Sequence, residues 1–400
     1  SYTNFQTRPI RPVKWPQNMF NKTVPCVQKF IWVILFVSSL LACDGTPSQG
    51  HKSKVFVSEG MRLYLEELVR TDDVVWAMDF IDSNTMIFTE RKGQLKLLDI
   101  KTNEVRPING GPVVFQGGSG GLFDILVDPG FETNGLIYLT YIKPIDDGST
   151  TAVARGKLQD DEIVDLTDLF IANNVSADPA HWGSRVVIDE DRYLFITVGD
   201  RHIPDNAQDL KSHGGKVLRL NDDGSVPSDN PFVGRNDAVA EIWSYGHRNP
   251  QGLAIQPATG LLFEQEHGPT GGDEINIVLR GKNYGWPVIT YGTDIWGGQL
   301  ADGTAKAGMQ QPLRFWQPGI APCGMTFYTG DRYAAWQGNL MNSTLRGYLT
   351  RLVLDKQKII NEERLLEDWR ERIRDVVQGP DDLLYVSTES GKIARIAPAQ

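Results

Sequence analysis

Residues 187–198, VIDEDRYLFITV, contain the pattern that decides the fold of this chain. A few apolar residues lead into a polar turn, and a run rich in aromatic and β-branched residues follows. Runs of this kind form β-strands, and a short polar segment between two of them is typical of a hairpin. The stretch therefore predicts two antiparallel strands joined by a turn.

The same hairpin pattern recurs along the chain. Six copies have their turns at residues 82, 128, 189, 256, 328 and 378, at steps of 46 to 72 residues, and the fifth copy is the weakest. Periods of about 40–50 residues with insertions are typical of β-propeller blades. We therefore expect an all-β fold, a six-bladed β-propeller over residues 61–400. A β-sandwich or two smaller β-domains are the alternatives, and the lack of a linker between the copies disfavours both.

The composition supports a folded globular chain and excludes several classes of protein. Of 400 residues, 40% are apolar and 22% are charged, and 40 Gly and 22 Pro supply turns. Helical periodicity is nearly absent, so residues 60–69 and 361–369 are expected to form short helical turns at most. The net charge of −10 argues against a nucleic-acid-binding protein, which needs a basic face. The three cysteines match no zinc spacing and cannot build a disulfide scaffold.

The first 42 residues have the character of a signal peptide. They carry five basic and no acidic residues, and Phe30–Ala42 is an apolar run of 13 residues, too short to span a bilayer comfortably. We therefore expect residues 1–42 to be removed on export. Met19 offers an alternative start that gives a signal peptide of ordinary length, which would make the residues before it an over-extension.

The end of this segment, Leu40–Cys43, resembles the lipobox of bacterial lipoproteins. The resemblance implies that Cys43 carries a lipid and becomes the first mature residue, with residues 43–60 as a lipidated cysteine and a polar tether. The expected location is the periplasm or cell envelope, with membrane contact only through this anchor. A plain signal peptide with an incidental cysteine is the alternative.

Three motifs within residues 246–287 contain candidate functional residues: GHRNPQGLA, EHGPTGGDEIN and NYGWP. Carbonyl oxygens at the Gly-Pro turn are free of strand pairing, and hard cations take such oxygens. Arg248 offers a planar fork of donors to a carboxylate or an oxyanion. In this order the motifs resemble the soluble glucose/sorbosone dehydrogenase family, whose aldose sugar dehydrogenase-like members are quinoproteins that use pyrroloquinoline quinone (PQQ). The resemblance runs from Val74 to Ile396.

The resemblance implies three catalytic residues. His181 matches the family's general base, a role that suits an imidazole because its ordinary pKa is about 6.5. Asp200 matches the carboxylate that holds the histidine and raises its basicity. Arg248 matches the residue that stabilises negative charge on the quinone oxygen. Taken alone, His181 would more often be a structural histidine and Arg248 a salt bridge between blades.

The resemblance also implies sites for PQQ and for Ca²⁺. The residues matched to PQQ binding are Arg248, Asn249, Arg372 and Arg374. The backbone carbonyls of Gly268 and Pro269 match the ligands of a calcium ion that also holds the cofactor, and Glu274 and Tyr284 match members of a second, structural calcium site. Without the resemblance, Arg372 and Arg374 would be interpreted as a solvated stripe on an edge strand.

Two positions depart from the family pattern. Ser119, in GGSGG, stands where the family has a glutamine that touches the cofactor. Arg346 aligns with a cofactor-binding lysine, and an arginine pairs with a carboxylate in a different geometry. In the long insertion at 290–320, Trp296, Gln311 and Trp316 are candidates for lining the path of the substrate.

The implied function is oxidation of the anomeric hydroxyl of an aldose to a lactone by an exported enzyme. Electrons would pass through PQQ to an external acceptor, because the sequence has no strand–GxGxxG–helix unit for NAD and no haem motif. One alternative is a calcium-dependent lactone hydrolase on the same fold. The other is a non-catalytic propeller that binds sugar or protein.

Overall fold

The computed structural model describes residues 52–399. The signal peptide predicted for residues 1–42, the lipidated Cys43 and most of the tether lie outside this range. The described residues form almost exclusively β-strands, arranged in six sheets. Among them, no helix has the length and apolar character that crossing a membrane requires.

Each sheet is one antiparallel blade. The first contains β3 (Val75–Phe80), β4 (Thr85–Glu90), β5 (Gln94–Asp99) and β6 (Val105–Ile108), and the second contains β7 (Leu122–Val127), β8 (Leu136–Ile145), β9 (Gly148–Gln159) and β10 (Glu162–Ile171). The third contains β11 (Gly183–Ile188), β12 (Tyr193–Val198), β13 (Lys216–Asn221) and β14 (Ile242–Tyr245), and the fourth contains β15 (Pro250–Ile255), β16 (Leu262–Glu266), β17 (Asp273–Ile277) and β18 (Arg314–Trp316).

The fifth blade contains β19 (Pro322–Phe327), β20 (Leu340–Thr344), β21 (Leu349–Asp355) and β22 (Lys358–Leu365). The sixth has five strands: β23 (Ile373–Gln378), β24 (Leu384–Thr388), β25 (Lys392–Pro398), β2 (Met61–Arg70) and β1 (Lys52–Ser58). The short helix α1 (Phe131–Asn134) and the 3₁₀ turns η1 (Pro204–Ala207) and η2 (Ala334–Trp336) lie in connections.

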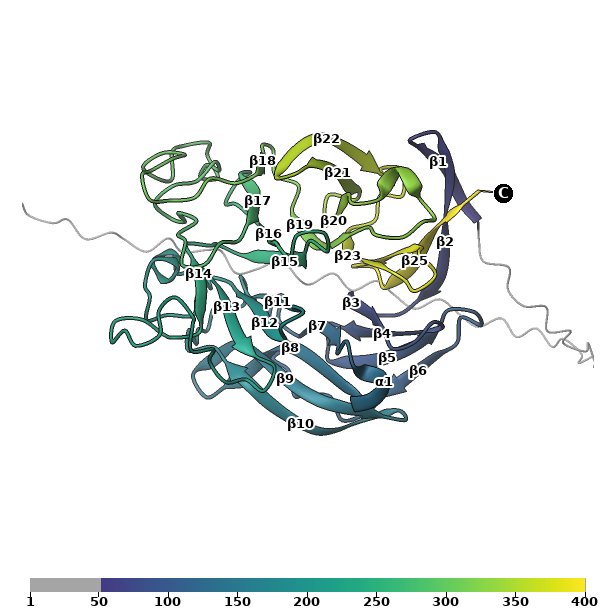
Figure 1. The fold of residues 1–400 in the computed structure, drawn as a ribbon, viewed down its shortest axis with the longest axis horizontal. Helices are drawn as coiled ribbons and strands as arrows, with labels where there is room; N and C mark the ends of the chain where they lie inside the picture. The colour runs from purple at the N-terminus through teal and green to yellow at the C-terminus, as the bar shows by residue number, and fades with distance from the viewer. Residues whose placement is uncertain (1–51, 400) are drawn as a thin grey trace, which may run out of the picture. The chain divides into compact units, whose positions relative to one another are not determined.

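The blades close into a ring around a central channel. The first strands of consecutive blades, β3, β7, β11, β15, β19 and β23, contact one another in that order, and β23 contacts β3. Figure 1 shows these six strands gathered at the centre, with the later strands of each blade outside them. The six-bladed β-propeller predicted from the repeat is therefore confirmed.

The two ends of the described region meet in the sixth blade. β2 pairs antiparallel with β25, with Leu65 opposite Ile396, so a strand from the start of the propeller completes the last sheet. The expectation of helical turns was wrong for 61–69 and 361–365, which are strands, whereas residues 367–369 form a turn. Residues 52–58, which the sequence assigned to the tether, form β1 on the outside of this sheet.

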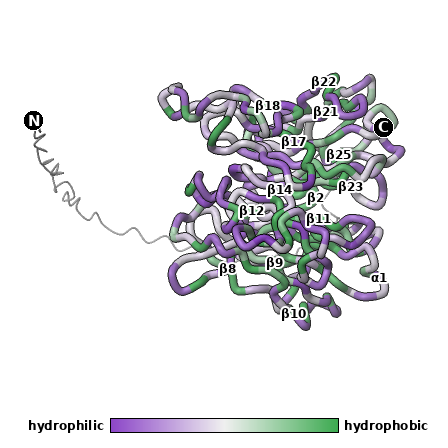
Figure 2. The backbone as a smooth tube through the Cα atoms, turned by 60° about the vertical axis from the view of Figure 1, so that its left-hand side comes forward, coloured by the Kyte–Doolittle hydropathy of each residue, from purple (hydrophilic) through white to green (hydrophobic). Residues whose placement is uncertain are grey.

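Apolar side chains between neighbouring blades form the core. Trp76 on β3 stacks on Phe123 on β7 with ring centroids 4.6 Å apart, which joins the first two blades near the channel. Figure 2 shows hydrophobic residues along strands such as β8, β9 and β11 and hydrophilic residues in peripheral loops. Full burial of one large apolar side chain contributes about 1.5–3 kcal/mol, so each blade interface is a substantial source of stability.

One mouth of the channel collects the site residues. The first two strands of a blade are antiparallel, so the chain enters the first strand and leaves the second at the same end. His181 and Arg248 precede β11 and β15, while Asp200 and Gly268 follow β12 and β16. Residues far apart in the sequence are therefore presented at the same mouth.

Candidate active site

His181 and Asp200 form a buried pair at this mouth. Gly183 at the start of β11 lies opposite Val198 at the end of β12, and this pairing brings the flanking residues together. His181 Nδ1 lies 2.7 Å from Asp200 Oδ1, and the Asp200 side chain is almost fully buried. The pairing expected from the resemblance is present in the structure.

Two further donors fix the Asp200 carboxylate. The indole Nε1 of Trp286 donates to Oδ2 at 2.8 Å, and the backbone N–H of His202 donates to Oδ1 at 3.0 Å. An ionised carboxylate only accepts hydrogen bonds, so His181 donates from Nδ1 and keeps a lone pair on Nε2. His181 is thus held with Nε2 available to accept a proton.

The pKa of His181 is lowered from its ordinary value of 6.5. Burial is the main cause, since it disfavours the imidazolium form, and the positive charges of Arg248 and His202 act in the same direction. The hydrogen bond to Asp200 raises the pKa, as expected from the resemblance, but burial outweighs it. The imidazole is therefore neutral at pH 7, as a general base must be.

Arg201 and His202 support this pair, and sequence reasoning assigned neither a role. The buried Arg201 guanidinium donates to the carbonyls of Ala180 at 3.0 Å and Ser149 at 2.7 Å, and it lies 3.5 Å from the ring of Trp182. The His202 ring lies 3.6 Å from the His181 ring. Arg201 directly follows Asp200, but its burial beneath the loop that carries His181 has no sequence signal.

Arg248 lies against the predicted calcium carbonyls. Its Nη1 donates to Gly268 O at 2.8 Å and to His267 O at 3.0 Å. Its own carbonyl accepts the Asp200 N–H at 2.8 Å, which connects it to the His181 pair. Its Nε is buried and has no hydrogen-bond partner within residues 52–399.

Asn249, the neighbour of Arg248, contacts the hairpin that carries His181. Its side-chain oxygen accepts the backbone N–H of Gly183 at 3.2 Å. Gln251 Nε2 approaches the same oxygen at 3.4 Å. The residue expected to touch the cofactor thus also links the third and fourth blades.

The turn at Gly268 and Pro269 is shaped by close backbone packing. Gly268 donates its N–H to Asp273 Oδ1 at 2.9 Å. A Cβ atom at Gly268 would lie 2.2 Å from the Gly271 carbonyl oxygen, so only glycine fits here. The turn therefore presents the Gly268 carbonyl to Arg248, whose guanidinium donates to it.

Glu274 and Tyr284 line the same small cavity as Arg248 and Gly268. Burial, and next the charge of Glu266 on the adjacent strand, raises the pKa of the Glu274 carboxyl well above its usual range. The Tyr284 hydroxyl donates to Ile277 O at 2.5 Å, so its side-chain oxygen is already engaged. The structure thus places both residues predicted for a second calcium site beside Gly268, which is predicted for the first.

Arg372 and Arg374 share one acidic partner, Glu389. Arg372 Nε lies 2.5 Å from Glu389 Oε2, and Arg374 Nη2 contacts Oε1 of the same carboxylate. β23 is an edge strand of its sheet, but it is the innermost strand of the blade and Arg374 is buried there. The interpretation as a solvated stripe is therefore wrong for Arg374 and holds only for the exposed Arg372. Arg374 Nε has no hydrogen-bond partner in the described part of the chain. Glu389 was missed because nothing in its local sequence points to the channel.

The two departures from the family pattern lie on opposite sides of the mouth. Ser119 Oγ accepts the Trp182 indole N–H at 3.2 Å and lies 3.2 Å from Pro179 O, so it ties down the loop before His181. Gln116 does not replace the missing glutamine, because it donates to Lys92 O at 2.8 Å. Arg346 is exposed and donates to Gly319 O at 3.2 Å.

The insertion at 290–320 contributes differently from expectation. Trp316 is buried on β18 and donates to Glu362 Oε1 at 2.9 Å, so it packs between the fourth and fifth blades. Gln311 accepts the Tyr291 hydroxyl at 2.7 Å. Trp296 is 88% exposed and Gln311 is also exposed, so these two remain candidates for a sugar contact.

Comparison with known proteins shows to which family this chain belongs. The sequence model of the family described as glucose/sorbosone dehydrogenase matches residues 72–395. The chain belongs to the glucose/sorbosone dehydrogenase family. The match covers all six innermost strands and every predicted site residue. It places the chain among oxidoreductases, as the resemblance implied.

Individual relatives agree with the family assignment. The chain is 40% identical over 335 residues to the aldose sugar dehydrogenase YliI of Escherichia coli (strain K12), covering 82% of this chain and 90% of that protein. The crystal structure of the soluble E. coli aldose sugar dehydrogenase in the apo-form superposes with a TM-score of 0.82 at 38% identity, covering 84% and 100% of the two chains. The PQQ-bound aldose sugar dehydrogenase of Streptomyces coelicolor has a TM-score of 0.71 at 23% identity, covering 84% and 98%, and shares the fold.

Proposed function

We propose that this chain is a PQQ-dependent aldose sugar dehydrogenase that oxidises the anomeric hydroxyl of an aldose to a lactone. The observation that carries the proposal is the His181 pair, since a buried neutral imidazole with a free Nε2 lies at the channel mouth. The dehydrogenase relatives and the PQQ-bound member of the fold support the choice of substrate and cofactor. Electrons would leave through an external acceptor.

The residues at the mouth fit a cofactor that carries several carboxylates. Arg248, Arg346, Arg372 and Arg374 all lie there. Glu389 is the acid that pairs with Arg372 and Arg374. The buried, unpartnered Nε atoms of Arg248 and Arg374 provide donors not used within the described chain. Arginine suits this role because its donors match a carboxylate bidentately.

The residues that would hold the cofactor and its calcium follow from this arrangement. Arg248 and Asn249 would hold the quinone side, and Arg346, Arg372 and Arg374 the carboxylates. The carbonyls of Gly268 and Pro269 would bind Ca²⁺, with Glu274 and Tyr284 at a second calcium. Ser119 is too short to reproduce a glutamine contact, and it holds Trp182 instead.

The chain's own residues would handle the proton. The anomeric hydroxyl gives its proton to His181 Nε2 while the C–H hydrogen leaves with its electron pair, so the carbon becomes a carbonyl. Asp200 stabilises the imidazolium that forms, through the Nδ1 hydrogen bond of 2.7 Å. When bound, PQQ supplies the two-electron acceptor for this oxidation. Arg248 supplies positive charge beside that acceptor.

We also propose that the enzyme is exported and anchored in the cell envelope through a lipid on Cys43. The apolar run and the lipobox-like LLAC support this location. Cell fractionation of the full chain and of a Cys43→Ala variant tests it. Membrane-bound wild type and a released variant are expected, and a cytoplasmic wild type would contradict export.

The alternative functions have weaker support. A calcium-dependent lactone hydrolase needs side-chain carboxylates and amides that converge on a metal open to substrate. Within residues 52–399, the side-chain cluster that could hold a metal, His247 with Glu264 and Glu266, is buried instead. A non-catalytic propeller leaves the His181 pair and the unpartnered arginine atoms without a role.

Dye reduction by the purified chain tests the proposed function. Aldose-dependent reduction is expected only when PQQ and Ca²⁺ are both present, and the product should be a lactone. Chelation should abolish activity, and calcium should restore it only together with PQQ, because two carbonyls alone make an incomplete calcium shell. Full activity after exhaustive chelation, confirmed by elemental analysis, would exclude calcium. No reduction of dye with any aldose under full reconstitution would exclude the dehydrogenase.

A further inference from the structure

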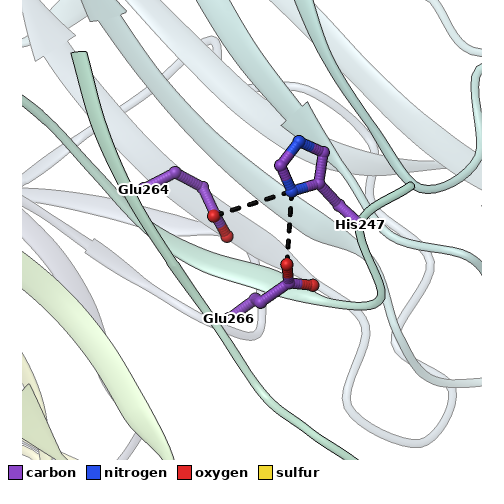
Figure 3. A group of neighbouring side chains, drawn as sticks. All are labelled: His247, Glu264 and Glu266. Carbon is purple, nitrogen blue, oxygen red and sulfur yellow. Dashed lines mark hydrogen bonds and ion pairs between the residues drawn. The ribbon is translucent and has the colours of Figure 1, made fainter. Parts of the chain in front are cut away.

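A buried cluster of His247, Glu264 and Glu266 lies beneath the Arg248 loop (Figure 3). His247 Nδ1 is 3.2 Å from Glu266 Oε1 and 3.6 Å from Glu264 Oε2. One ligand atom from each residue lies within 4.8 Å of the other two. Glu264 and Glu266 alternate on β16, so both side chains point to the same face of the blade.

The charges in this cluster are not balanced by the chain. Glu274 lies directly opposite Glu266 on β17, which adds a third carboxylate to the same face. Among the residues whose side chains the structure describes, no lysine or arginine forms an ion pair with any of the three. A buried carboxylate is stable only when it is protonated or lies beside a positive charge, so a bound cation is one way to stabilise this cluster.

Unpartnered oxygen atoms give an independent reason to expect a ligand. Glu264 is completely buried, and its Oε1 has no hydrogen-bond partner among residues 52–399. Asn276 is also buried, and its Oδ1 is unpartnered although its amide nitrogen donates to Glu264 Oε2 at 3.1 Å. Buried polar atoms are normally paired, so two unpaired oxygens in one acidic cluster point to an absent cation.

The environment of His247 suits metal coordination. Its Nε2 lies 2.8 Å from Ser244 Oγ, and donation from Nε2–H leaves a lone pair on Nδ1 facing the two carboxylates. Metal-bound histidines are commonly oriented through their second ring nitrogen in this way. The Tyr284 ring stacks on the imidazole with centroids 4.6 Å apart and fixes its plane.

We propose that His247, Glu264 and Glu266 bind one divalent transition-metal cation of the Zn²⁺ class. One imidazole nitrogen with carboxylate oxygens is a donor set for such metals, whereas Ca²⁺ takes oxygen ligands only. The cation would be distinct from the calcium ions assigned to Gly268, Pro269, Glu274 and Tyr284. Glu266 also accepts the backbone N–H of Arg248, so a cation that fixes Glu266 would fix the Arg248 loop.

Metal titration of the full chain tests this site without reference to activity. After chelator treatment, the wild type should bind one equivalent of Co²⁺ with a visible ligand-field absorption band, and Zn²⁺ should displace it. Glu264→Gln keeps the side-chain shape and should weaken binding at least tenfold, since even outer-shell changes cost 10–100-fold. Zn²⁺ should raise the unfolding temperature of the wild type and not of this variant.

Matched variants separate this site from its neighbours. His202→Asn removes an exposed imidazole near His181 and should bind Co²⁺ nearly as the wild type does. If Glu264→Gln does not fold, His247→Gln serves in its place. The proposal is overturned if the wild type binds no stoichiometric Co²⁺ or Zn²⁺. It is also overturned if binding survives in Glu264→Gln and His247→Gln, or is lost equally in His202→Asn. None of these results bears on the proposed dehydrogenase activity.

Discussion

The channel mouth has two halves that are built differently. The base half comprises His181 and Asp200, where the carboxylate has three donors from within the chain and Nδ1 of the imidazole is engaged. The cation half comprises Arg346, Arg372 and Arg374, where two arginines share Glu389 and a buried guanidinium nitrogen is unpartnered. Contacts within the chain therefore suffice to orient the proton acceptor. The arginines, in contrast, have hydrogen-bond donors that the described residues do not use and that an anion can engage.

Replacing His181 should give the largest effect, because it removes the proton acceptor assigned to the base half. His181→Ala is expected to lower kcat by about 100-fold or more, the usual contribution of a positioned acid–base group. PQQ binding, measured by titration into apo-protein, should stay nearly unchanged. His213→Ala is the matched control, since His213 is a buried histidine that contacts Glu241 and Asn173 outside the site. Near-normal turnover in His181→Ala would remove the base assignment.

Replacing Arg374 should instead weaken the binding of PQQ by the cation half. Arg374→Met keeps the apolar length of the side chain but removes the buried charge, so PQQ affinity should fall by about 10- to 100-fold. A hydrogen bond to a charged group contributes about 1.5–3 kcal/mol, and about 1.4 kcal/mol corresponds to one decade in Kd. Arg106→Met, on the outermost strand of the first blade, is the control. Equal affinities in the two variants would show that Arg374 does not face the cofactor.

Much of the fold could be predicted because the repeat is local. Each copy of the pattern contains the first two strands of a blade and their turn, and it therefore revealed six blades. The outer strands lack a common pattern. β2 was expected to form helical turns at most, and one of its two partners, β25, lies more than 300 residues away. Neither the sequence of β2 nor that of β25 alone indicates that the two strands pair and close the ring.

The site shows the same division between local and distant information. His181, Asp200 and Arg248 stand in recognisable motifs, and the structure brings the three together through hydrogen bonds. Glu389 contacts Arg374, and Arg201 contacts Ala180, only after the chain has folded, so the sequence around them does not indicate these contacts. Glu264 became notable once its buried, unpartnered oxygen and the nearby His247 were seen together.

The two departures from the family pattern should have smaller and unequal effects. Arg346→Ala removes a charge from the cation half and should weaken PQQ binding by about tenfold, since about 1.4 kcal/mol is one decade. Ser119→Ala removes neutral hydrogen bonds to Trp182 and Pro179, each contributing about 0.5–1.5 kcal/mol, and should weaken binding only a few-fold. PQQ titration into both variants measures the ranking. A larger loss in Ser119→Ala would show that the loop before His181 matters more than the charge of Arg346.

The smallest effect should appear in the pH dependence of the base half. Because burial lowers the pKa of His181 from 6.5, the acid limb of kcat/KM should have its midpoint below pH 6.5. Activity requires the neutral imidazole, so it should fall as the pH drops through that midpoint. The positive charge of His202 contributes to the lowering, so His202→Asn should raise the pKa and move the limb toward higher pH. Its shift should be small, because the charge of His202 ranks below burial among the causes. A limb that moves to lower pH in this variant would show that the His202 ring does not act on His181 through its charge.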